Sequence, residues 1–388
     1  MKKIAIVGRG TVGCMAVSHF LKWTDWQIDW IYDPLISPTV VGEGTTLSFP
    51  RSLSENLSLD NSNMFALKAT PKLGISKRNW GSENNFSHSF AMGQSGIHFD
   101  AVVFQDYIFN KLCNNPRLKL IEKNMEVSDI DADHVMVCSG TPKSFEQEYK
   151  IVENIPVNAC FVSQCPWESP RFNETLTYAM SWGWVFGIPL QHRCAIGYVY
   201  NDTFASEEQV KKEVQDILDE LKLVPSIQRS IKFNNYYRTN NFSNRVIYNG
   251  NASFFLEPLE ATSTHFAQMI NRMAMDVFKH NMDFNQYGNQ RYLAELDNIE
   301  SMICLHYFAG SVFKNNFWSY AENLASKKIN FVMSSLNPFS NMVKTAINAN
   351  HVGFGEGSED VGTWPLRSFK VNINGLGVED KLKQIISS

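Results

Sequence analysis

The sequence has few of the features that mark proteins outside the ordinary globular class. Its seven cysteines are an odd number without a CxxC pair, so neither a disulfide framework nor a zinc site is expected. No apolar run approaches the ~20 residues that a membrane span needs. No long basic run occurs, and the formal net charge is −4, which disfavours nucleic acid as a partner. We therefore expect a cytoplasmic protein without a metal site, a membrane partner or a nucleic-acid partner.

What is present is a chain of substantial length with the apolar content of a globular protein. Its 388 residues are 44% hydrophobic and 19% charged, which is enough to form one large domain or two ordinary ones. Aromatic residues make up 13%, a share that fills a core and also suits a pocket for a flat aromatic ligand. The chain shows no internal repeat and no low-complexity linker. The sequence is compatible with a homo-oligomer.

The N-terminus carries a nucleotide-binding pattern. In KIAIV, residues 3–7, the four residues after Lys3 form an unbroken apolar run typical of a strand buried on both faces. It leads into GRGTVG, residues 8–13, and then into a predicted helix. In this pattern Gly8 permits the tight turn, Gly10 lets the backbone approach a pyrophosphate at the helix N-terminus, and Gly13 lets helix and strand pack closely.

A second predicted strand supports this interpretation. WQIDWIYD ends on Asp33, twenty residues after Gly13, where an acid can bind ribose hydroxyls. The order of strand, glycine turn, helix and acid predicts a dinucleotide site. This pattern alone does not separate FAD from NAD. The residues expected to bind the cofactor here are Gly8, Gly10, Thr11, Val12, Gly13 and Asp33.

Later segments predict an α/β fold with insertions. Residues 132–141 and 245–255 are predicted strands that lie far apart in the sequence, and residues 206–223 are a predicted amphipathic helix with Ser206 as its cap. We expect an FAD-binding Rossmann-like domain of the flavin monooxygenase type, with an inserted β-rich substrate region and a helical C-terminal part. The expected boundaries are a discontinuous FAD domain over 1–290 with insertions at about 51–92 and 145–244, then helical residues 291–388 on the substrate side.

The stretch SFFLEPLEATSTHF, residues 253–266, places two acids among apolar residues. A solvated loop leading into a helix would explain it, because acids favour the positive end of a helix. Chemistry at a buried carboxylate is the other explanation. We expect Glu257 to face water or the flavin edge and assign it no role.

These motifs together resemble the flavin-dependent halogenases of the tryptophan-halogenase type. The matches occur in the same order from residue 3 to about residue 318, and this colinearity is more specific than any single motif. The resembling segments are GRGTVG at 8–13, VVGEGTTLSFP at 40–50, KLGISKRNW at 72–80, GIHFDAVVF at 96–104, GWVFGIPLQHR at 183–193, GNASFFLEPLEAT at 250–262 and LHYFAGSVFKNNFW at 305–318.

The resemblance implies an activity and a set of residues. FAD, delivered as FADH2 by a separate flavin reductase, would react with O2 and a halide ion to form hypohalous acid. Lys72 and Glu260 would use that acid to halogenate an electron-rich aromatic such as an indole, pyrrole or phenol. The backbone amides of Thr262 and Ser263 would hold the halide. The resemblance and the predicted strands add four residues to the expected cofactor site: Gly42, Thr45, Gly140 and Asn251.

The sequence also departs from the family pattern. Phe186 stands where the family has the second tryptophan of W-x-W-x-I-P, Ala261 replaces a serine, and Ser263 replaces a glycine. The chain is also shorter at its C-terminal end than the family. Two alternatives stay open: an NAD(P)H-dependent FAD aromatic hydroxylase on the same fold, and a non-catalytic FAD-binding protein.

Overall fold

A computed structural model describes residues 2–36, 43–82, 85–90, 94–145, 147–349 and 364–387. These residues form two compact units, each built from three segments of the chain. The first unit comprises Met1–Ala69, Ile97–Ile151 and Tyr236–Ala294, and the second comprises Thr70–Gly96, Val152–Asn235 and Glu295–Ser388.

A six-stranded sheet forms the centre of the first unit, in the order β16-β17-β8-β1-β2-β7. Neighbouring strands are parallel except for the antiparallel pair β16 and β17. Ile4, Ala5 and Ile6 of the predicted first strand are fully buried, as expected for a strand covered on both faces. The strands are β1 (Lys3–Val7), β2 (Gln27–Tyr32), β7 (Leu118–Glu122), β8 (His134–Val137), β16 (Phe242–Ser243) and β17 (Val246–Tyr248).

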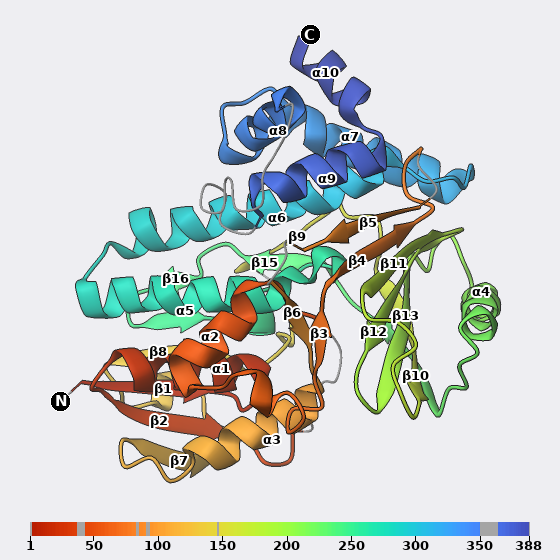
Figure 1. The fold of residues 1–388 in the computed structure, drawn as a ribbon. Helices are drawn as coiled ribbons and strands as arrows, with labels where there is room; N and C mark the ends of the chain where they lie inside the picture. The colour runs from red at the N-terminus through yellow and green to blue at the C-terminus, as the bar shows by residue number, and fades with distance from the viewer. Residues whose placement is uncertain are drawn as a thin grey trace. The chain divides into compact units, whose positions relative to one another are not determined.

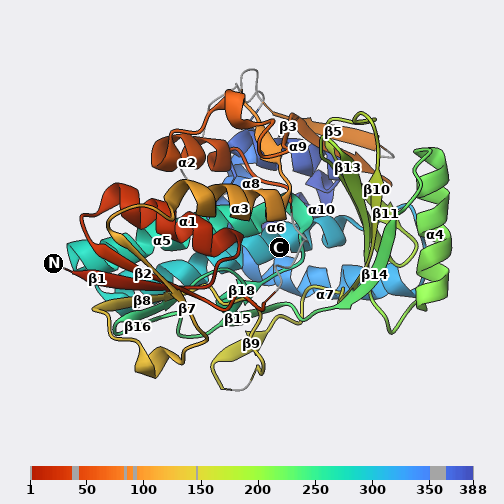
Figure 2. The same ribbon diagram turned by 90° about the horizontal axis from the view of Figure 1, so that it is seen from below.

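Helices pack against this sheet around α1. Figures 1 and 2 show α1, α2, α3 and α5 gathered beside the sheet, and α1 contacts the other three. A smaller apolar cluster around Ile130 and Val135 covers another part of the sheet. The helices are α1 (Thr11–Trp23), α2 (Ser48–Leu57), α3 (Ala101–Leu112) and α5 (Thr262–His280).

Shorter elements complete the first unit. Strands β9, β15 and β18 form a small antiparallel sheet. The bounds are β6 (Gly96–His98), β9 (Tyr149–Ile151), β15 (Tyr236–Arg238), β18 (Phe254–Phe255), η1 (Asn61–Asn63), η2 (Val127–Asp129), η3 (Gly250–Ala252), η4 (Leu259–Ala261) and the π-helical η5 (Phe284–Asn289).

The second unit is built on a seven-stranded sheet in the order β14-β10-β13-β12-β11-β4-β5. It is antiparallel except where β4 runs parallel to β11. The predicted β-rich middle of the chain is therefore present. The strands of this sheet are β4 (Gly74–Arg78), β5 (Asn85–Ser89), β10 (Ala159–Pro166), β11 (Thr175–Met180), β12 (Gly183–Pro189), β13 (Arg193–Tyr200) and β14 (Ile227–Lys232). The short strand β3 (Thr70–Lys72) also belongs to the second unit but lies outside this sheet.

One amphipathic helix covers this sheet, and the C-terminal part of the unit is helical. Helix α4 (Glu207–Glu220) packs on β10 and β13 through Val210 and Val214, and Ser206 caps it as predicted. Figures 1 and 2 both show α4 beside these strands. The remaining helices are α6 (Gln290–Ala309), α7 (Asn316–Met333), α8 (Pro338–Asn348), α9 (Leu366–Leu376) and α10 (Glu379–Ser387).

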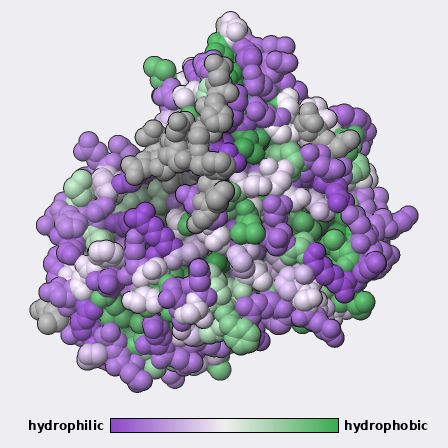
Figure 3. All heavy atoms as spheres, viewed as in Figure 1, coloured by the Kyte–Doolittle hydropathy of each residue, from purple (hydrophilic) through white to green (hydrophobic). Residues whose placement is uncertain are grey.

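Hydrophilic residues cover most of the face seen in Figure 3, with smaller apolar areas between them. None of the helices in the described ranges has the length and apolar character required to cross a membrane.

A buried histidine in α1 predicts that the first unit loses stability in acid. His19 is 6% exposed, and burial, with a smaller contribution from the Arg272 guanidinium, lowers the pKa of His19 to about 4. The neutral ring stabilises the fold above pH ~6.5, and this contribution is lost as the pH falls towards 4. We expect His19→Leu to reduce the difference in unfolding free energy between pH 7 and pH 4 by up to about 3 kcal/mol. Urea unfolding of both proteins at the two pH values measures this, and an equal pH dependence would contradict it.

Candidate functional site

The turn between β1 and α1 requires glycine at two of its three predicted positions. Gly8 has a φ of +115°, and a Cβ there would lie 2.3 Å from the carbonyl oxygen of Cys138. A Cβ on Gly13 would lie 2.1 Å from the carbonyl oxygen of Gly8. Both positions therefore bring two stretches of backbone into contact, as the spacing of the glycines predicted.

Gly10 differs from its two neighbours in the motif. Its φ of −67° and ψ of 179° are open to any residue, and a Cβ there would meet no atom of the described residues within 4 Å, its chain neighbours aside. Gly10 is also the N-cap of α1, which has no side-chain cap and no acidic residue in its first turn. An uncapped helix N-terminus beside open space is a site for a phosphate group, because the first amides of the helix and its dipole both favour an anion. The chain therefore fits the pyrophosphate of a dinucleotide at this point.

Other predicted cofactor residues lie around the same turn. Asp33 directly follows β2, and one of its carboxylate oxygens accepts the amide of Leu35 at 2.9 Å. Gly140 follows β8 with a φ of +91°, and no atom in the described part of the chain lies within 4 Å of a Cβ built there. Asn251 lies in η3, whose Gly250 approaches Val12 so closely that a Cβ would lie 2.9 Å away. Since β2 and β8 flank β1, these positions meet where a doubly wound sheet binds nucleotides.

The segment before α2 is held on β6 by Thr45. The Thr45 side chain is fully buried, and its hydroxyl lies 2.9 Å from both the amide and the carbonyl oxygen of Ile97. The Thr45 amide also donates to that carbonyl, at 3.1 Å. The predicted cofactor residue Gly42 lies outside the described residues. Glu43, which sequence reasoning missed, is 2% exposed and accepts the amide of Ala101 at the start of α3.

The start of α5 is preceded by an unusual turn. Glu260 and Ala261 have φ values of 70° and 54°, the left-handed region that non-glycine residues rarely adopt. Such conformations cost about 1–3 kcal/mol each and cluster at functional sites. Helix α5 begins at Thr262 without a side-chain cap and without an acid in its first turn. The amides of Thr262 and Ser263, the predicted halide contacts, are therefore the first of an uncapped helix.

Both acids of this stretch are buried. Glu260 is 8% exposed and Glu257 is 0% exposed. Glu257 was expected to face water or the flavin edge. Its burial shows that the expectation of water is wrong, and the solvated-loop interpretation of the stretch fails with it. Sequence alone could not decide this, because burial here depends on residues distant in the chain.

Lys72 belongs to the second unit, where it ends β3. Its side chain is 1% exposed, and its Nζ lies 5.9 Å from the centroid of the Phe90 ring. The Phe90 amide donates to the carbonyl of Leu73 at 2.9 Å, which fixes the ring next to the lysine. An ammonium at this distance from an aromatic face is within cation–π range. Phe90 is a candidate residue that sequence reasoning missed.

The strand bearing Lys72 is tied to the segment GWVFGIP. The Thr70 hydroxyl donates to the carbonyl of Pro189, the last residue of β12, at 2.5 Å. Phe186, which replaces the family's second tryptophan, is 5% exposed. Its ring lies over Gly197 of β13, where a Cβ would lie 2.1 Å from the ring. The Phe186 ring is therefore buried against the neighbouring strand of this sheet.

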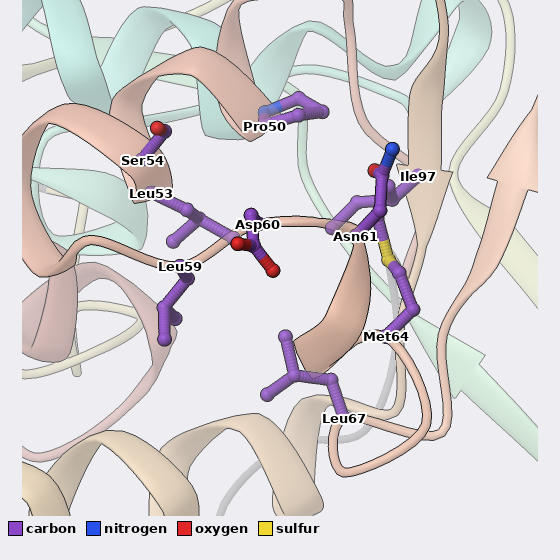
Figure 4. Close-up of a pocket in the computed structure, with 9 residues that line it drawn as sticks. All are labelled: Pro50, Leu53, Ser54, Leu59, Asp60, Asn61, Met64, Leu67 and Ile97. Carbon is purple, nitrogen blue, oxygen red and sulfur yellow. The ribbon is translucent and has the colours of Figure 1, made fainter.

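Figure 4 shows a separate cavity of about 240 Å³ in the first unit. One residue of its wall, Ile97, accepts a hydrogen bond from the Thr45 hydroxyl. None of the sequence-predicted site residues lines the cavity. In the described residues, no group of three or more His, Cys, Asp or Glu side chains has the arrangement of a metal site. The lining residues are Pro50, Leu53, Ser54, Leu59, Asp60, Asn61, Met64, Leu67 and Ile97.

A comparison with known protein families tests the resemblance to the flavin-dependent halogenases. The sequence model described as "Tryptophan halogenase" matches residues 3–152 and 146–349, which is most of the chain. The chain belongs to the tryptophan halogenase family. The resemblance stated from the motifs is confirmed.

Tryptophan 7-halogenase RebH of Lentzea aerocolonigenes is 26% identical to the chain over 239 residues. The match covers 59% of the chain but only 40% of RebH, so the chain matches about two fifths of that relative's length.

Two solved structures confirm the predicted fold class. The tryptophan halogenase from Shewanella frigidimarina has a TM-score of 0.79 at 17% identity, covering 100% of this chain and 93% of that one. BrvH, a flavin-dependent halogenase from Brevundimonas sp. BAL3, has a TM-score of 0.74 at 18% identity, covering 100% and 94%. The α/β fold of the flavin-binding type is therefore shown.

Proposed function

We propose that this chain is an FADH2-dependent halogenase of an electron-rich aromatic compound. The observation that carries the proposal is a fully buried lysine beside an aromatic ring, Lys72 with Phe90, in a chain of the tryptophan halogenase family. The relatives named as tryptophan halogenases act on tryptophan. For this chain we propose the broader class of indoles, pyrroles and phenols, used in the cytoplasm with a separate flavin reductase.

The first unit would bind the flavin. The turn at Gly10 and the first amides of α1 would hold the pyrophosphate, and Asp33 would accept hydrogen bonds from ribose hydroxyls. Reduced FAD, when bound, supplies the electrons with which O2 and a halide ion become hypohalous acid. The amides of Thr262 and Ser263 would hold the halide, since two amides of an uncapped helix N-terminus favour an anion.

Lys72 and Glu260 would act in the halogenation itself. The Lys72 ammonium would donate a hydrogen bond to hypohalous acid and so orient its halogen, which is a positioning effect. The ring carbon of the substrate would form a bond to the halogen as the halogen–oxygen bond breaks, and the oxygen would leave as hydroxide, which becomes water with the proton that the ring carbon releases. The Glu260 carboxylate would take the proton lost from that carbon, as a general base.

A product screen tests the proposed function. The FAD-loaded protein is incubated with a flavin reductase, NADH, O2 and chloride, bromide or iodide, and a set of small aromatics is analysed by mass spectrometry. We expect a product in which one hydrogen is replaced by the halogen supplied. A hydroxylated product, with NAD(P)H oxidised by the protein alone, would identify the hydroxylase instead. Tight FAD binding with no product from any aromatic would identify a binding protein.

A further inference from the structure

Arg9 lies between Gly8 and Gly10 in the turn, and its side chain is held against α3. Its Nη2 donates to Oδ1 of Asp106 at 2.9 Å, and its Cζ lies 3.9 Å from the centroid of the Phe109 ring. Asp106 and Phe109 are three positions apart on α3, so they lie on the same face of that helix. The ring below the guanidinium and the ion pair at its edge together fix the plane of this group.

The guanidinium of Arg9 also reaches the end of β2. Its Cζ lies 5.5 Å from the centroid of the Tyr32 ring. Tyr32 is the last residue of β2 and directly precedes Asp33. The side chain therefore extends from the turn beside Gly10 to the strand end beside Asp33. In a doubly wound sheet, the adenosine half of a dinucleotide binds along this path.

One face of the guanidinium is left for a ligand. The centroids of Phe109 and Tyr32 are 5.8 Å apart, much less than their two distances to Cζ added together, so the two rings do not lie on opposite faces of Arg9. The Arg9 side chain is 33% exposed. In the described part of the chain its Nε is buried without a hydrogen bond, and its Nη2 is paired with Asp106. Nη1 and the face away from Phe109 remain for a ligand.

A planar cation fixed in this way suits a flat base better than a phosphate. Guanidinium groups stack on aromatic rings, and nucleobases gain both stacking and cation–π attraction on such a plane. The Asp106 carboxylate offsets the positive charge of Arg9, which weakens its attraction for a phosphate. The first amides of α1, which have no side-chain cap, already provide for the pyrophosphate.

We propose that Arg9 is the stacking platform for the adenine of FAD and gives the site its preference for an adenine nucleotide. The inference rests on the flavin site of the proposed function. The base stacks on the guanidinium face away from Phe109, while Asp33 takes the ribose hydroxyls and the turn at Gly10 takes the pyrophosphate. Arg9 is therefore a further cofactor-binding residue, and α3 orients it.

Nucleotide titrations of the flavin-free, full-length protein test the proposal. ADP and UDP share the ribose and the diphosphate and differ only in the base, and calorimetry gives the dissociation constants of both and of FAD. We expect Arg9→Met, which keeps the length of the side chain without its plane, to raise the constants of FAD and ADP about 5- to 100-fold, the usual effect of one side chain that stacks on a base. The constant of UDP, whose ring is smaller, should change less. Arg291→Met removes another arginine of the first unit from an aromatic ring, that of Tyr287, and should leave all three constants unchanged.

Arg9→Lys separates stacking from charge. Lysine keeps the positive charge but has no planar group, so we expect this variant to bind FAD and ADP nearly as weakly as Arg9→Met does. Wild-type affinity in Arg9→Lys would show that charge alone matters, and equal losses for ADP and UDP in Arg9→Met would place Arg9 at the ribose or the diphosphate. Either result overturns the proposal, as does an unchanged FAD affinity in Arg9→Met. ADP binding that depends on Arg9, in a protein that forms no halogenated product, would contradict the proposed function and leave the inference standing.

Discussion

Gly10→Val is expected to remove FAD binding while leaving the protein folded. The backbone at Gly10 is open to any residue, and among the described residues no atom beyond the chain neighbours lies within 4 Å of the added Cβ. The new side chain would instead occupy the space where the pyrophosphate meets the amides of α1. Loss of two hydrogen bonds to a charged group, at about 1.5–3 kcal/mol each, corresponds to an affinity lower by about 100-fold or more. Flavin titration and thermal unfolding on the same preparation measure the two effects.

Gly13→Val is the matched comparison. The same side chain there would meet the carbonyl oxygen of Gly8 at 2.1 Å, so the turn itself must move. We expect this variant to lose stability as well as flavin. If Gly10→Val still binds FAD with wild-type affinity, the pyrophosphate lies elsewhere.

The glycine turn could be predicted from sequence because its constraints are local. Backbone contacts at Gly8 and Gly13 exclude any side chain, so the need for glycine is visible in the sequence as residue type and spacing. The strand at 3–7 and the helix capped by Ser206 are similar cases, since buried faces and caps leave periodic or positional patterns. In α4 the capping partner proves to be Gln209, the third helical residue.

Contacts between segments that are far apart in the sequence left no such pattern of residue type or spacing. Ser48 and His265 are 217 positions apart, and nothing in either segment predicts the hydrogen bond between them. The left-handed conformation of Glu260 was equally hidden, because glycine is the residue that normally signals it. Phe90 was missed for the same reason: its relation to Lys72 depends on the hydrogen bond between Phe90 and Leu73, which continues the antiparallel pairing of β4 and β5 by one residue on each strand. Local sequence therefore predicted the glycine turn better than the surroundings of the proposed catalytic residues.

Substitution of Lys72 or Glu260 is expected to separate halogenation from flavin chemistry. Lys72→Ala removes the group proposed to orient hypohalous acid, and Glu260→Gln keeps the shape of the side chain but removes the proposed base. Both variants should bind FAD and consume oxygen with reduced flavin as the wild type does. Aromatic product should fall by about 10²–10⁴-fold, the usual effect of a positioned acid–base group, with Lys72→Ala the more severe. Product yield and oxygen uptake on the same preparations measure the separation.

A second buried lysine provides the control for this result. Lys77, like Lys72, is 1% exposed, but its Nζ lies 2.5 Å from Nε2 of His306 and 2.8 Å from Oδ1 of Asn372. Lys77→Met should lower stability by about 1–3 kcal/mol for each of these acceptors that loses its donor. Its folded fraction should still form product. If Lys72→Met behaves like Lys77→Met, with product retained, then Lys72 is a structural lysine and the proposed halogenation step loses its positioning group.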